Sequence, residues 1–374
     1  MDRGGLHSET RGIILTEIRC LDCGQPYPET GVSHRCPRCG GLFDASLWNF
    51  DLSRIDSSQP GLWRYRDTFG LPENVPPLTL GEGNTPLLWA EVFGRQVAFK
   101  CEFANPTGSF KDRGMATLVA ALKARGVTEA VEDSSGNAGA AFAAYAARAN
   151  IKARVFVPES ASGPKRIQIE MYGAELVPVP GPRSAATATA LKAVEQGAVY
   201  ASHAYLPFNL PGYATAAYEI WEQVGGEVGA VILPAGQGGF LLGMARGFQA
   251  LVNANLLKRM PVLIGVQAAA CAPLVAFAEG RSMEIGEEPT LAEGVWVLDA
   301  LRKVEVVKVV LDSGGRFVSA EEADILPGRD ELAHRGFYVE PTSAIVWSAL
   351  RAELVNLPDP VVVVLTGSGY KFRT

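Results

Sequence analysis

The stretch Asn105-Pro106-Thr107-Gly108-Ser109-Phe110-Lys111-Asp112-Arg113 places a lysine behind a proline- and glycine-rich turn, where a helical pattern begins. Ser109 is a candidate N-cap, and Asp112 three residues later would complete a capping box. Lys111 would then lie at the positive end of the helix dipole, where a neutral amine is favoured over a charged one. A neutral amine can form a Schiff base. The alternative is an exposed lysine on a surface helix.

Strand and helix patterns alternate outward from this stretch. Apolar runs typical of buried strands lie at 97–101, 130–133, 153–157, 175–179, 230–233, 262–266 and 361–365. Helical patterns lie at 112–125, 138–149, 164–171, 185–195 and 239–252. The alternation predicts an α/β protein with mostly parallel sheets. The length of 374 residues allows two α/β lobes with a cleft between them.

Three turns between these elements are candidate binding sites. The first, Ser134-Ser135-Gly136-Asn137-Ala138-Gly139, joins a strand to a helix and offers backbone amides and hydroxyls to an anion. The Asn137 side-chain amide could donate to a phenolic oxygen on a ring. The alternative is a plain strand-to-helix turn.

The second turn, Pro234-Ala235-Gly236-Gln237-Gly238-Gly239, also follows a strand and precedes a helix. Its glycines let the backbone approach a phosphate, although it is neither a Walker loop nor a dinucleotide fingerprint. The third, Leu365-Thr366-Gly367-Ser368-Gly369, follows the last strand. A hydroxyl there would face the cleft and could bond a ring nitrogen, unless the segment is only a strand end with a glycine turn.

Together these sites describe one cofactor. A lysine amine, an amide for a phenolate, a phosphate cradle and a hydroxyl for a pyridine nitrogen are the groups that pyridoxal 5'-phosphate requires. The four segments therefore predict an enzyme that uses pyridoxal phosphate.

Four of the six cysteines form two pairs with metal-ligand spacing, Cys20-x2-Cys23 and Cys36-x2-Cys39. Four thiolates at this spacing can hold one tetrahedral zinc ion with no open position, which indicates a structural site. A metal-free or disulfide-linked hairpin is the alternative. Cys101 and Cys271 stand alone in apolar surroundings and are expected in the core.

Composition excludes other classes of protein. The net charge of −6 lacks the basic surplus of a nucleic-acid-binding protein. No apolar run reaches the roughly 18 residues that a membrane span needs. The first ten residues lack the order of a signal peptide, so a cytoplasmic protein is expected. Five segments follow: a disordered leader (1–12), a zinc-ribbon-like module (13–46), a strap packed on the body (47–93), a smaller α/β lobe (94–206) and a larger one (207–374, with part of 60–93).

The chain resembles the fold-type II pyridoxal-phosphate enzymes, and among them the threonine synthase group. Besides the four segments above, Leu80-Gly81-Glu82-Gly83-Asn84-Thr85-Pro86-Leu87 carries the resemblance, and the cysteine module is similar to that of many such chains. It spans about residues 60–369. The resemblance implies a two-lobed architecture with mostly parallel sheets, plus the small zinc module, and a homodimer that binds a small amino-acid substrate.

The resemblance also implies roles for single residues. Lys111 would be the Schiff-base lysine and acid–base group, and Asn137 would contact the phenolic oxygen. Gly236, Gln237, Gly238 and Gly239 would hold the cofactor phosphate, although Gln237 replaces the Asn or Gly more usual there. Thr366, with Ser368 as second choice, would face the pyridine nitrogen. Thr85, Ser134 and Ser135 would receive the substrate carboxylate.

One departure affects the expected substrate. The group binds the phosphate of O-phosphohomoserine partly through an arginine, and residues 202–212, which look equivalent, contain no Arg or Lys and have Asn209 instead. Loss of a charge-assisted pair costs about 1.5–3 kcal/mol. Lys165 and Arg166 are the favoured replacements, ahead of Arg113.

The resemblance therefore predicts a carbon–oxygen lyase that converts O-phosphohomoserine and water to threonine and phosphate, in threonine biosynthesis. The alternative activity is that of a serine or threonine dehydratase, or of a β-replacing enzyme such as a cysteate or cysteine synthase. A non-catalytic regulatory chain of the same fold is a third possibility, which the intact Lys111, Asn137 and glycine loop disfavour.

Overall fold

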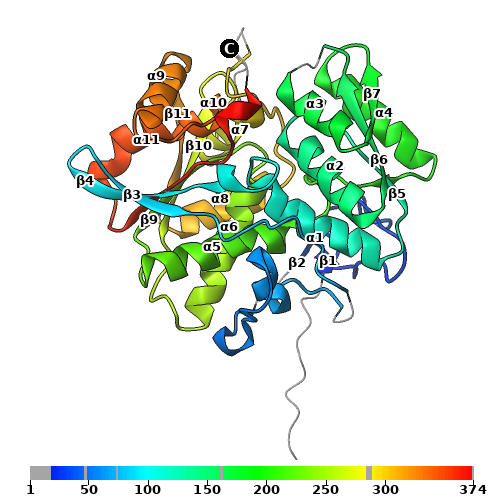
Figure 1. Cartoon of the computed structure of the whole chain (residues 1–374), viewed down its shortest axis with the longest axis horizontal. Helices are drawn as coiled ribbons and strands as arrows, with labels where there is room; N and C mark the ends of the chain where they lie inside the picture. The colour runs from blue at the N-terminus through cyan, green and yellow to red at the C-terminus, as the bar shows by residue number, and fades with distance from the viewer. Residues whose placement is uncertain (1–17, 46–48, 73–74, 161–162, 284–288, 373–374) are drawn as a thin grey trace, which may run out of the picture.

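The computed structural model describes residues 18–45, 49–72, 75–160, 163–283 and 289–372. The expected leader, residues 1–12, and the first residues of the expected zinc module lie outside this part of the chain. The described residues form two α/β lobes side by side, with a small module at the N-terminal end (Figure 1). Each lobe is built around its own sheet, so the predicted α/β class is confirmed.

Six strands form the larger sheet, in the order β11-β10-β9-β12-β4-β3. They are β3 (Leu87–Val92), β4 (Arg95–Lys100), β9 (Ala230–Pro234), β10 (Val262–Ala268), β11 (Arg316–Ala320) and β12 (Val361–Val364). Every neighbouring pair is parallel except the β3–β4 hairpin at one edge. β12 consists of four fully buried valines, the pattern of a central strand covered on both faces.

Helices cover both faces of this sheet (Figure 1). They are α5 (Leu210–Val224), α6 (Gly239–Asn253), α7 (Pro273–Ala278), α8 (Lys303–Asp312), α9 (Glu322–Ala333), α10 (Pro341–Ala344) and α11 (Val346–Glu353). On one face Val362 and Val364 share a core with α5, α6 and α8. On the other, Val361 and Val363 share a core with α9 to α11. Successive side chains of β12 therefore point to opposite faces of the sheet, and each face has its own apolar core.

The smaller lobe has a parallel four-stranded sheet, in the order β7-β6-β5-β8. Its strands are β5 (Glu129–Glu132), β6 (Lys152–Pro158), β7 (Glu175–Val179) and β8 (Val199–Tyr200). Its helices are α2 (Asn137–Ala149), α3 (Pro164–Met171) and α4 (Arg183–Glu195). α1 (Lys111–Ala124) packs against both α2 and α5 and so connects the lobes.

The predicted strands and helices are all present, and their ends differ by no more than two residues. One boundary differs from the prediction. The sequence places the start of the smaller lobe at residue 94, whereas β4 lies in the larger sheet, paired with β12, and the smaller sheet begins with β5. The chain therefore enters the larger lobe first, crosses to the smaller lobe and returns.

The start of α1 also corrects the sequence analysis. Phe110 is the N-cap residue and makes no side-chain capping bond, so Ser109 is not the cap. The Asp112 carboxylate instead accepts from the backbone N–H (2.6 Å) and hydroxyl (2.5 Å) of Thr107, which closes the preceding turn. The predicted capping box is therefore wrong, although the predicted helix is right.

The N-terminal module is a short antiparallel pair, β1 (Ile18–Cys20) and β2 (Phe43–Ala45). Trp63 and Tyr65 of the following strap are fully buried. Cys101 and Cys271 are buried as expected. Single-turn or short 3-10 helices are η1 (Leu52–Arg54), η2 (Gly61–Thr68), η3 (Glu102–Ala104), η4 (Pro207–Asn209), η5 (Glu293–Val295), η6 (Leu354–Asn356) and η7 (Gly369–Lys371).

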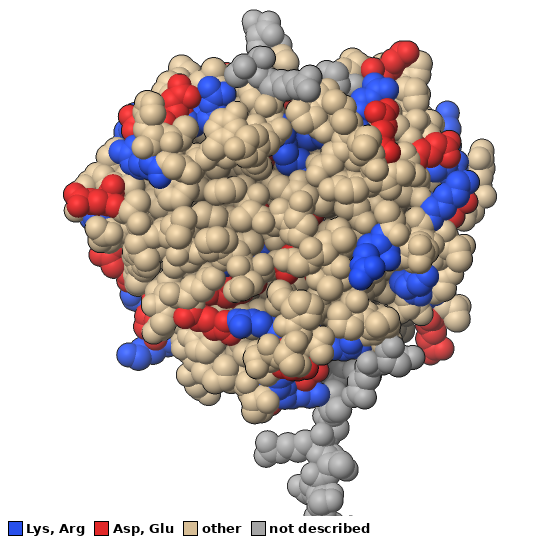
Figure 2. Space-filling view, in the orientation of Figure 1, with Lys and Arg blue, Asp and Glu red and all other residues tan. Residues whose placement is uncertain are grey.

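Among the described residues no helix is long and apolar enough to cross a membrane. On the face drawn in Figure 2, basic and acidic side chains are interspersed along the edges, and the middle is mostly covered by other residues. This face therefore has no broad basic surface of the kind that nucleic acid requires.

Candidate active site

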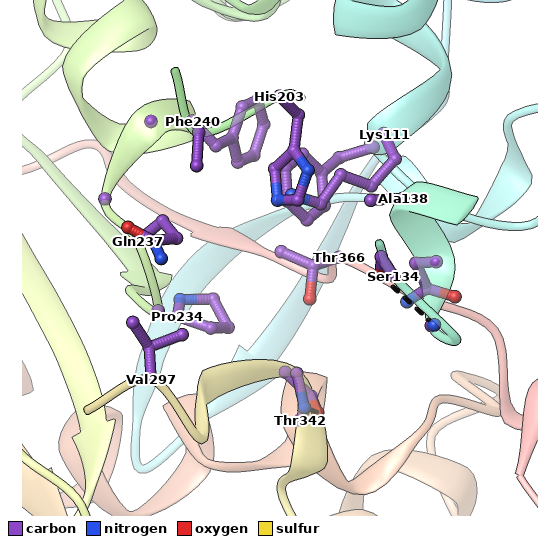
Figure 3. A pocket seen from close by; sticks show the side chains of 18 of the residues that line it. Lys111, Ser134, Ala138, His203, Pro234, Gln237, Phe240, Val297, Thr342 and Thr366 are labelled. Atoms are coloured by element: carbon purple, nitrogen blue, oxygen red, sulfur yellow. Dashed lines mark hydrogen bonds between the residues drawn. The ribbon is translucent and has the colours of Figure 1, made fainter. Parts of the chain in front are cut away.

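A pocket between the two lobes brings together most of the predicted site residues (Figure 3). Strand-to-helix connections of both sheets reach it, as expected for a binding site in an α/β protein. From the predicted set, the residues that line it are Lys111, Ser134, Ser135, Asn137, Lys165, Gly236, Gln237, Gly238, Gly239 and Thr366. Thr85, Arg166 and Ser368 do not line this pocket.

Lys111 is the first residue of α1 and projects into the pocket (Figure 3). The Phe110 N–H donates to the Thr366 carbonyl oxygen (3.0 Å), which ties the start of the helix to the end of β12. Burial lowers the pKa of Lys111 to about 7, against the opposing effect of the Glu132 carboxylate. The amine is thus available in its neutral, nucleophilic form near neutral pH, chiefly through burial.

The turn before α2 presents Ser134, Ser135 and Asn137 to the pocket. Gly139 lets α2 start close to this turn, because a Cβ there would lie 1.8 Å from the Ser134 carbonyl oxygen. Asn137 Nδ2 donates to Glu340 Oε1 (2.7 Å), and its buried Oδ1 has no partner. The turn therefore keeps an unsatisfied polar atom at the pocket, as a site for a polar ligand does.

The glycine loop after β9 forms the opposite wall. Gly238 has φ +78°, and a Cβ at this position would meet the Val306 side chain at 2.7 Å. At Gly236 a Cβ would come within 2.8 Å of the Gly294 carbonyl oxygen. Gln237 Oε1 accepts from the Leu301 N–H (3.2 Å) and anchors the loop. A bare backbone ahead of α6 could hold a phosphate at a helix N-terminus.

Thr366 lies at the end of β12 and lines the pocket, while Ser368 does not. Thr366 Oγ1 is 2.9 Å from Ser343 Oγ, with which it shares a hydrogen bond. Ser368 Oγ instead accepts from the Tyr370 N–H (3.3 Å) as the N-cap of η7. Of the two hydroxyls, only that of Thr366 is placed to meet a ring nitrogen.

The structure separates the cations considered for the substrate phosphate. Lys165 lines the pocket but is 3.1 Å from the buried Glu340 carboxylate and 3.7 Å from that of Glu293. Although burial lowers the pKa of Lys165, these two carboxylates raise it overall. Arg166 is paired with Glu170 on α3, at 3.6 Å. Neither residue therefore presents an uncommitted charge to the pocket.

Arg113 and Thr85 belong to a buried network outside the pocket, contrary to the roles considered for them. Arg113 is fully buried and bonds Glu102 and Glu219. Thr85 Oγ1 donates to Glu102 Oε1 (2.7 Å) and accepts from Arg113 Nη2 (3.1 Å). Both side chains are thus engaged in the core.

Sequence reasoning missed His203 and Arg183, which line the pocket, and Glu132, which contacts His203. Glu132 ends β5, and His203 lies in the segment 202–212, which contains no Arg or Lys. His203 and Arg183 line the pocket, and His203 Nδ1 is 3.0 Å from Glu132 Oε1. The chain has only four histidines, so a histidine in the segment 202–212 could have been considered a candidate site residue.

The four cysteine thiols converge in the N-terminal module. Their Sγ atoms all lie within 4.8 Å of one another, as a tetrahedral zinc ion would require. Arg302, which lines the pocket, donates to the Phe43 carbonyl oxygen of β2 (2.8 Å) and to that of Tyr205 (3.0 Å). The module thus lies against the wall of the pocket.

We expect one zinc ion per chain, lost in Cys36→Ser, because a tetrahedral site cannot keep its affinity with three thiolates. Elemental analysis measures the zinc, and limited proteolysis measures the order of residues 18–45. Cleavage there should increase, while cofactor absorbance changes less. Cys271→Ser is the control, since Cys271 is buried elsewhere. A native protein without zinc, with four titratable thiols, would contradict this expectation.

Residues 78–367 match the family described as pyridoxal-phosphate dependent enzyme. The chain is 30% identical to the threonine synthase of Methanosarcina acetivorans, over 94% of this chain and 91% of that protein. It is 33% identical to the threonine synthase of Mycobacterium leprae, over 82% of this chain and 87% of that protein.

Solved structures show the same architecture. The threonine deaminase of T.th. is similar with a TM-score of 0.66 and 27% identity, over 78% of this chain and 94% of that one. Maize serine racemase has a TM-score of 0.66 at 22% identity, over 76% of this chain and 88% of that one, and supports the fold alone.

Proposed function

The chain belongs to the family of pyridoxal-phosphate-dependent enzymes, and on that basis we propose that it converts O-phosphohomoserine and water to threonine and phosphate. The observation that carries the proposal is the meeting of Lys111, the glycine loop and Thr366 in one pocket, in a chain similar to threonine synthases over most of its length. The test is the release of phosphate and threonine from O-phosphohomoserine by the purified protein.

Pyridoxal phosphate fits the groups that line the pocket. Gly236 to Gly239 would hold its phosphate, Asn137 its phenolic oxygen and Thr366 its ring nitrogen, with Lys111 at its carbonyl carbon. Asn137 Nδ2 gives one N–H to Glu340 and keeps a second N–H for the phenolic oxygen, and this donor and the bare glycine backbone support the fit. When bound, the cofactor supplies an electron sink for negative charge on the substrate.

The chain's own groups would perform the binding and proton transfers. Ser134 and Ser135, with the backbone amides at the start of α2, would orient the substrate carboxylate. Lys111 Nζ would take the α proton of the substrate, because its pKa of about 7 suits both uptake and release. A hydroxyl partner at Thr366, rather than a carboxylate, leaves the ring nitrogen largely unprotonated and suits elimination and replacement.

We further propose that Arg183 binds the distal phosphate of the substrate. Asn209 is buried, and its Nδ2 donates to the His203 carbonyl oxygen (2.6 Å), so it holds the loop rather than a ligand. Arg183 lines the pocket from the start of α4, is exposed, and makes no ion pair within the described ranges. Arg183 and His203 line the same pocket, so Arg183 shares it with the segment 202–212, which contains no cation.

Arg183→Gln should raise KM for O-phosphohomoserine about 10- to 150-fold, because it removes a charge-assisted pair of about 1.5–3 kcal/mol. Cofactor absorbance should not change. Steady-state kinetics measure the effect. Arg166→Gln is the matched control, since Arg166 is paired on α3 outside the pocket, and its KM should stay within about twofold. If both variants change KM for O-phosphohomoserine equally, Arg183 does not bind the phosphate, and Lys165 becomes the favoured candidate.

The second candidate is a serine or threonine dehydratase or a β-replacing synthase. The missing cation at Asn209 and the similarity to a threonine deaminase support it. Keto-acid formation from serine and threonine, measured beside phosphate release, separates the two activities. A protein without visible cofactor absorbance would instead support a non-catalytic role.

Two further features of the protein are proposals. We expect a cytoplasmic protein, because six free cysteines, four of them clustered as metal ligands, suit a reducing compartment. We also expect a homodimer, which sedimentation of the purified chain would test.

A further inference from the structure

A buried carboxylate contacts a histidine that lines the pocket. Glu132 ends β5 and is fully buried. Its Oε1 atom is 3.0 Å from His203 Nδ1, and the Ser134 backbone N–H donates to its Oε2 atom. The pair thus joins the ends of two neighbouring strands, since His203 follows β8 closely and β5 pairs with β8.

Burying such a carboxylate lowers the stability of the folded protein. Within the described part of the chain Glu132 has no Lys or Arg at ion-pair distance, and burial raises its pKa to about 7. Removing an ionised carboxylate from water costs several kcal/mol unless partners compensate. Its partners here are the backbone amides of Ser134 and Asp133 and the histidine, while the charges of Arg183 and Lys111 favour the ionised form from beyond ion-pair distance. A leucine of similar size would fill the space without that cost, so the carboxylate points to a role in the pocket.

The hydrogen bond fixes the imidazole. An ionised Glu132 can only accept, so with Glu132 ionised Nδ1 carries the proton of this bond and Nε2 is the free nitrogen of the ring. His203 lines the same pocket as Lys111, and both project toward the same hollow (Figure 3). The groups that face His203 from neighbouring elements are Lys111, Arg183 and Asp133, besides Glu132. Two cations near the ring favour its neutral form, which can accept a proton.

We propose that His203 is a second proton-transfer group of the reaction, acting beside Lys111, and that Glu132 is its positioning residue. The inference rests on the proposed function, whose chemistry includes several proton transfers. A proton must leave the α carbon and another the β carbon, one must be delivered to the γ carbon, and later one must leave the water that becomes the threonine hydroxyl.

The step that we assign to His203 is the addition of water. When phosphate leaves the γ carbon, the double bond first lies between the β and γ carbons. Delivery to the γ carbon of a proton taken earlier from the substrate completes the methyl group and moves the unsaturation to between the α and β carbons. The water oxygen bonds to the β carbon while one O–H bond breaks, and Nε2 takes that proton. The Lys111 ammonium gives a proton to the α carbon. One proton is taken up and one delivered, so hydration is balanced and needs no oxidant or reductant.

The test uses His203→Gln and Glu132→Gln as full-length holoenzymes, with phosphate, threonine and 2-oxobutyrate all measured from O-phosphohomoserine. In His203→Gln, threonine formation should fall about 10²- to 10⁴-fold. Phosphate release should fall less, because it precedes hydration. The phosphate-to-threonine ratio should therefore rise above one, with 2-oxobutyrate and ammonia accounting for the difference. Cofactor absorbance should match that of the wild type, which shows that the pocket is intact.

Glu132→Gln should shift the product ratio in the same direction by about tenfold. The acid limb of its pH–rate profile should also move to lower pH, because loss of the negative charge lowers the pKa of His203 and also removes the effect by which Glu132 raises the pKa of Lys111. The product ratio, which depends on hydration, therefore assigns the effect to His203. Glu129→Gln is the matched control on the same strand, where the side chain lies in a partly exposed ion pair with Arg154, and it should change neither quantity.

The outcomes are distinct. If both variants keep one threonine per phosphate, whether turnover is normal or reduced, His203 has no part in hydration and the inference is overturned. If the wild type forms no threonine from O-phosphohomoserine, the proposed function fails and the inference falls with it. An excess of phosphate over threonine in His203→Gln, with a wild-type ratio of one, supports both.

Discussion

Lys111→Ala should lose turnover by at least about 10⁴-fold, because one amine both binds the cofactor carbonyl and transfers the α proton. Phosphate and threonine formation measure the loss. In the wild type we expect a visible absorption band that borohydride removes, with the pyridoxyl group fixed on Lys111. Its pKa of about 7 provides the neutral amine for this bond, and Lys111→Ala should not retain the label.

Lys371 is the matched control for burial. It is also a buried lysine, and burial lowers its pKa to about 8. Its Nζ donates to the Thr107 carbonyl oxygen (2.7 Å), and it does not line the pocket. Lys371→Met should therefore keep the borohydride-fixed label. A label on Lys371, or on any lysine other than Lys111, would mean that the motif at 105–113 has been misinterpreted.

The parts of the site that could be predicted from sequence are those built from local segments. Each turn at 134–139, 234–239 and 365–369 follows a strand, and in α/β sheets the carboxyl ends of strands meet at one edge. Strand order therefore places the turns at 234–239 and 365–369 together, since both follow strands of the larger sheet, whereas the turn at 134–139 follows β5 of the smaller sheet and was joined to them by the groups that one cofactor requires. Their glycines were also informative, because a backbone that approaches a ligand or another segment closely requires glycine.

The parts that could not be predicted depend on pairing between distant segments. Glu132 and His203 are 71 residues apart, and only the β5–β8 pairing brings them together. Likewise β4 joins the larger sheet because it pairs with β12 near the C-terminus, and nothing in its own sequence indicates that partner. Single-chain periodicity gives the type of an element, whereas its neighbours come from the packing of the whole chain.

Arg113 illustrates the same limit. Its position two residues after Lys111 predicts another face of the helix and ranks it below Lys165 and Arg166 as a ligand, but does not reveal its partners in the core. Arg113 Nε is 2.7 Å from Glu102 Oε2, and Nη2 is 2.6 Å from Glu219 Oε2. Lys100 Nζ is 2.7 Å from the same Glu219 oxygen. The charges of two cations and two carboxylates thus neutralise one another in the buried core. The four residues come from β4, η3, α1 and α5.

Arg113→Met should destabilise the protein by about 3–5 kcal/mol, because it leaves two buried carboxylates facing Lys100 alone. Urea unfolding measures the loss. Lys123→Met is the matched control: Lys123 is exposed on the same helix, and the loss of stability there should stay below about 0.5 kcal/mol.

The loss of stability in Arg113→Met should also depend on pH. Burial raises the pKa of Glu219, but Arg113 and Lys100 outweigh it and hold this pKa below its usual range. The contribution of Glu219 to stability is therefore present above its unfolded-state pKa and is lost as pH falls. In Arg113→Met this contribution shrinks, and the difference in stability between variant and wild type should narrow below about pH 4. A loss under about 1 kcal/mol at neutral pH would mean that water or a shifted backbone compensates the carboxylates, and that the four charges do not act as one unit.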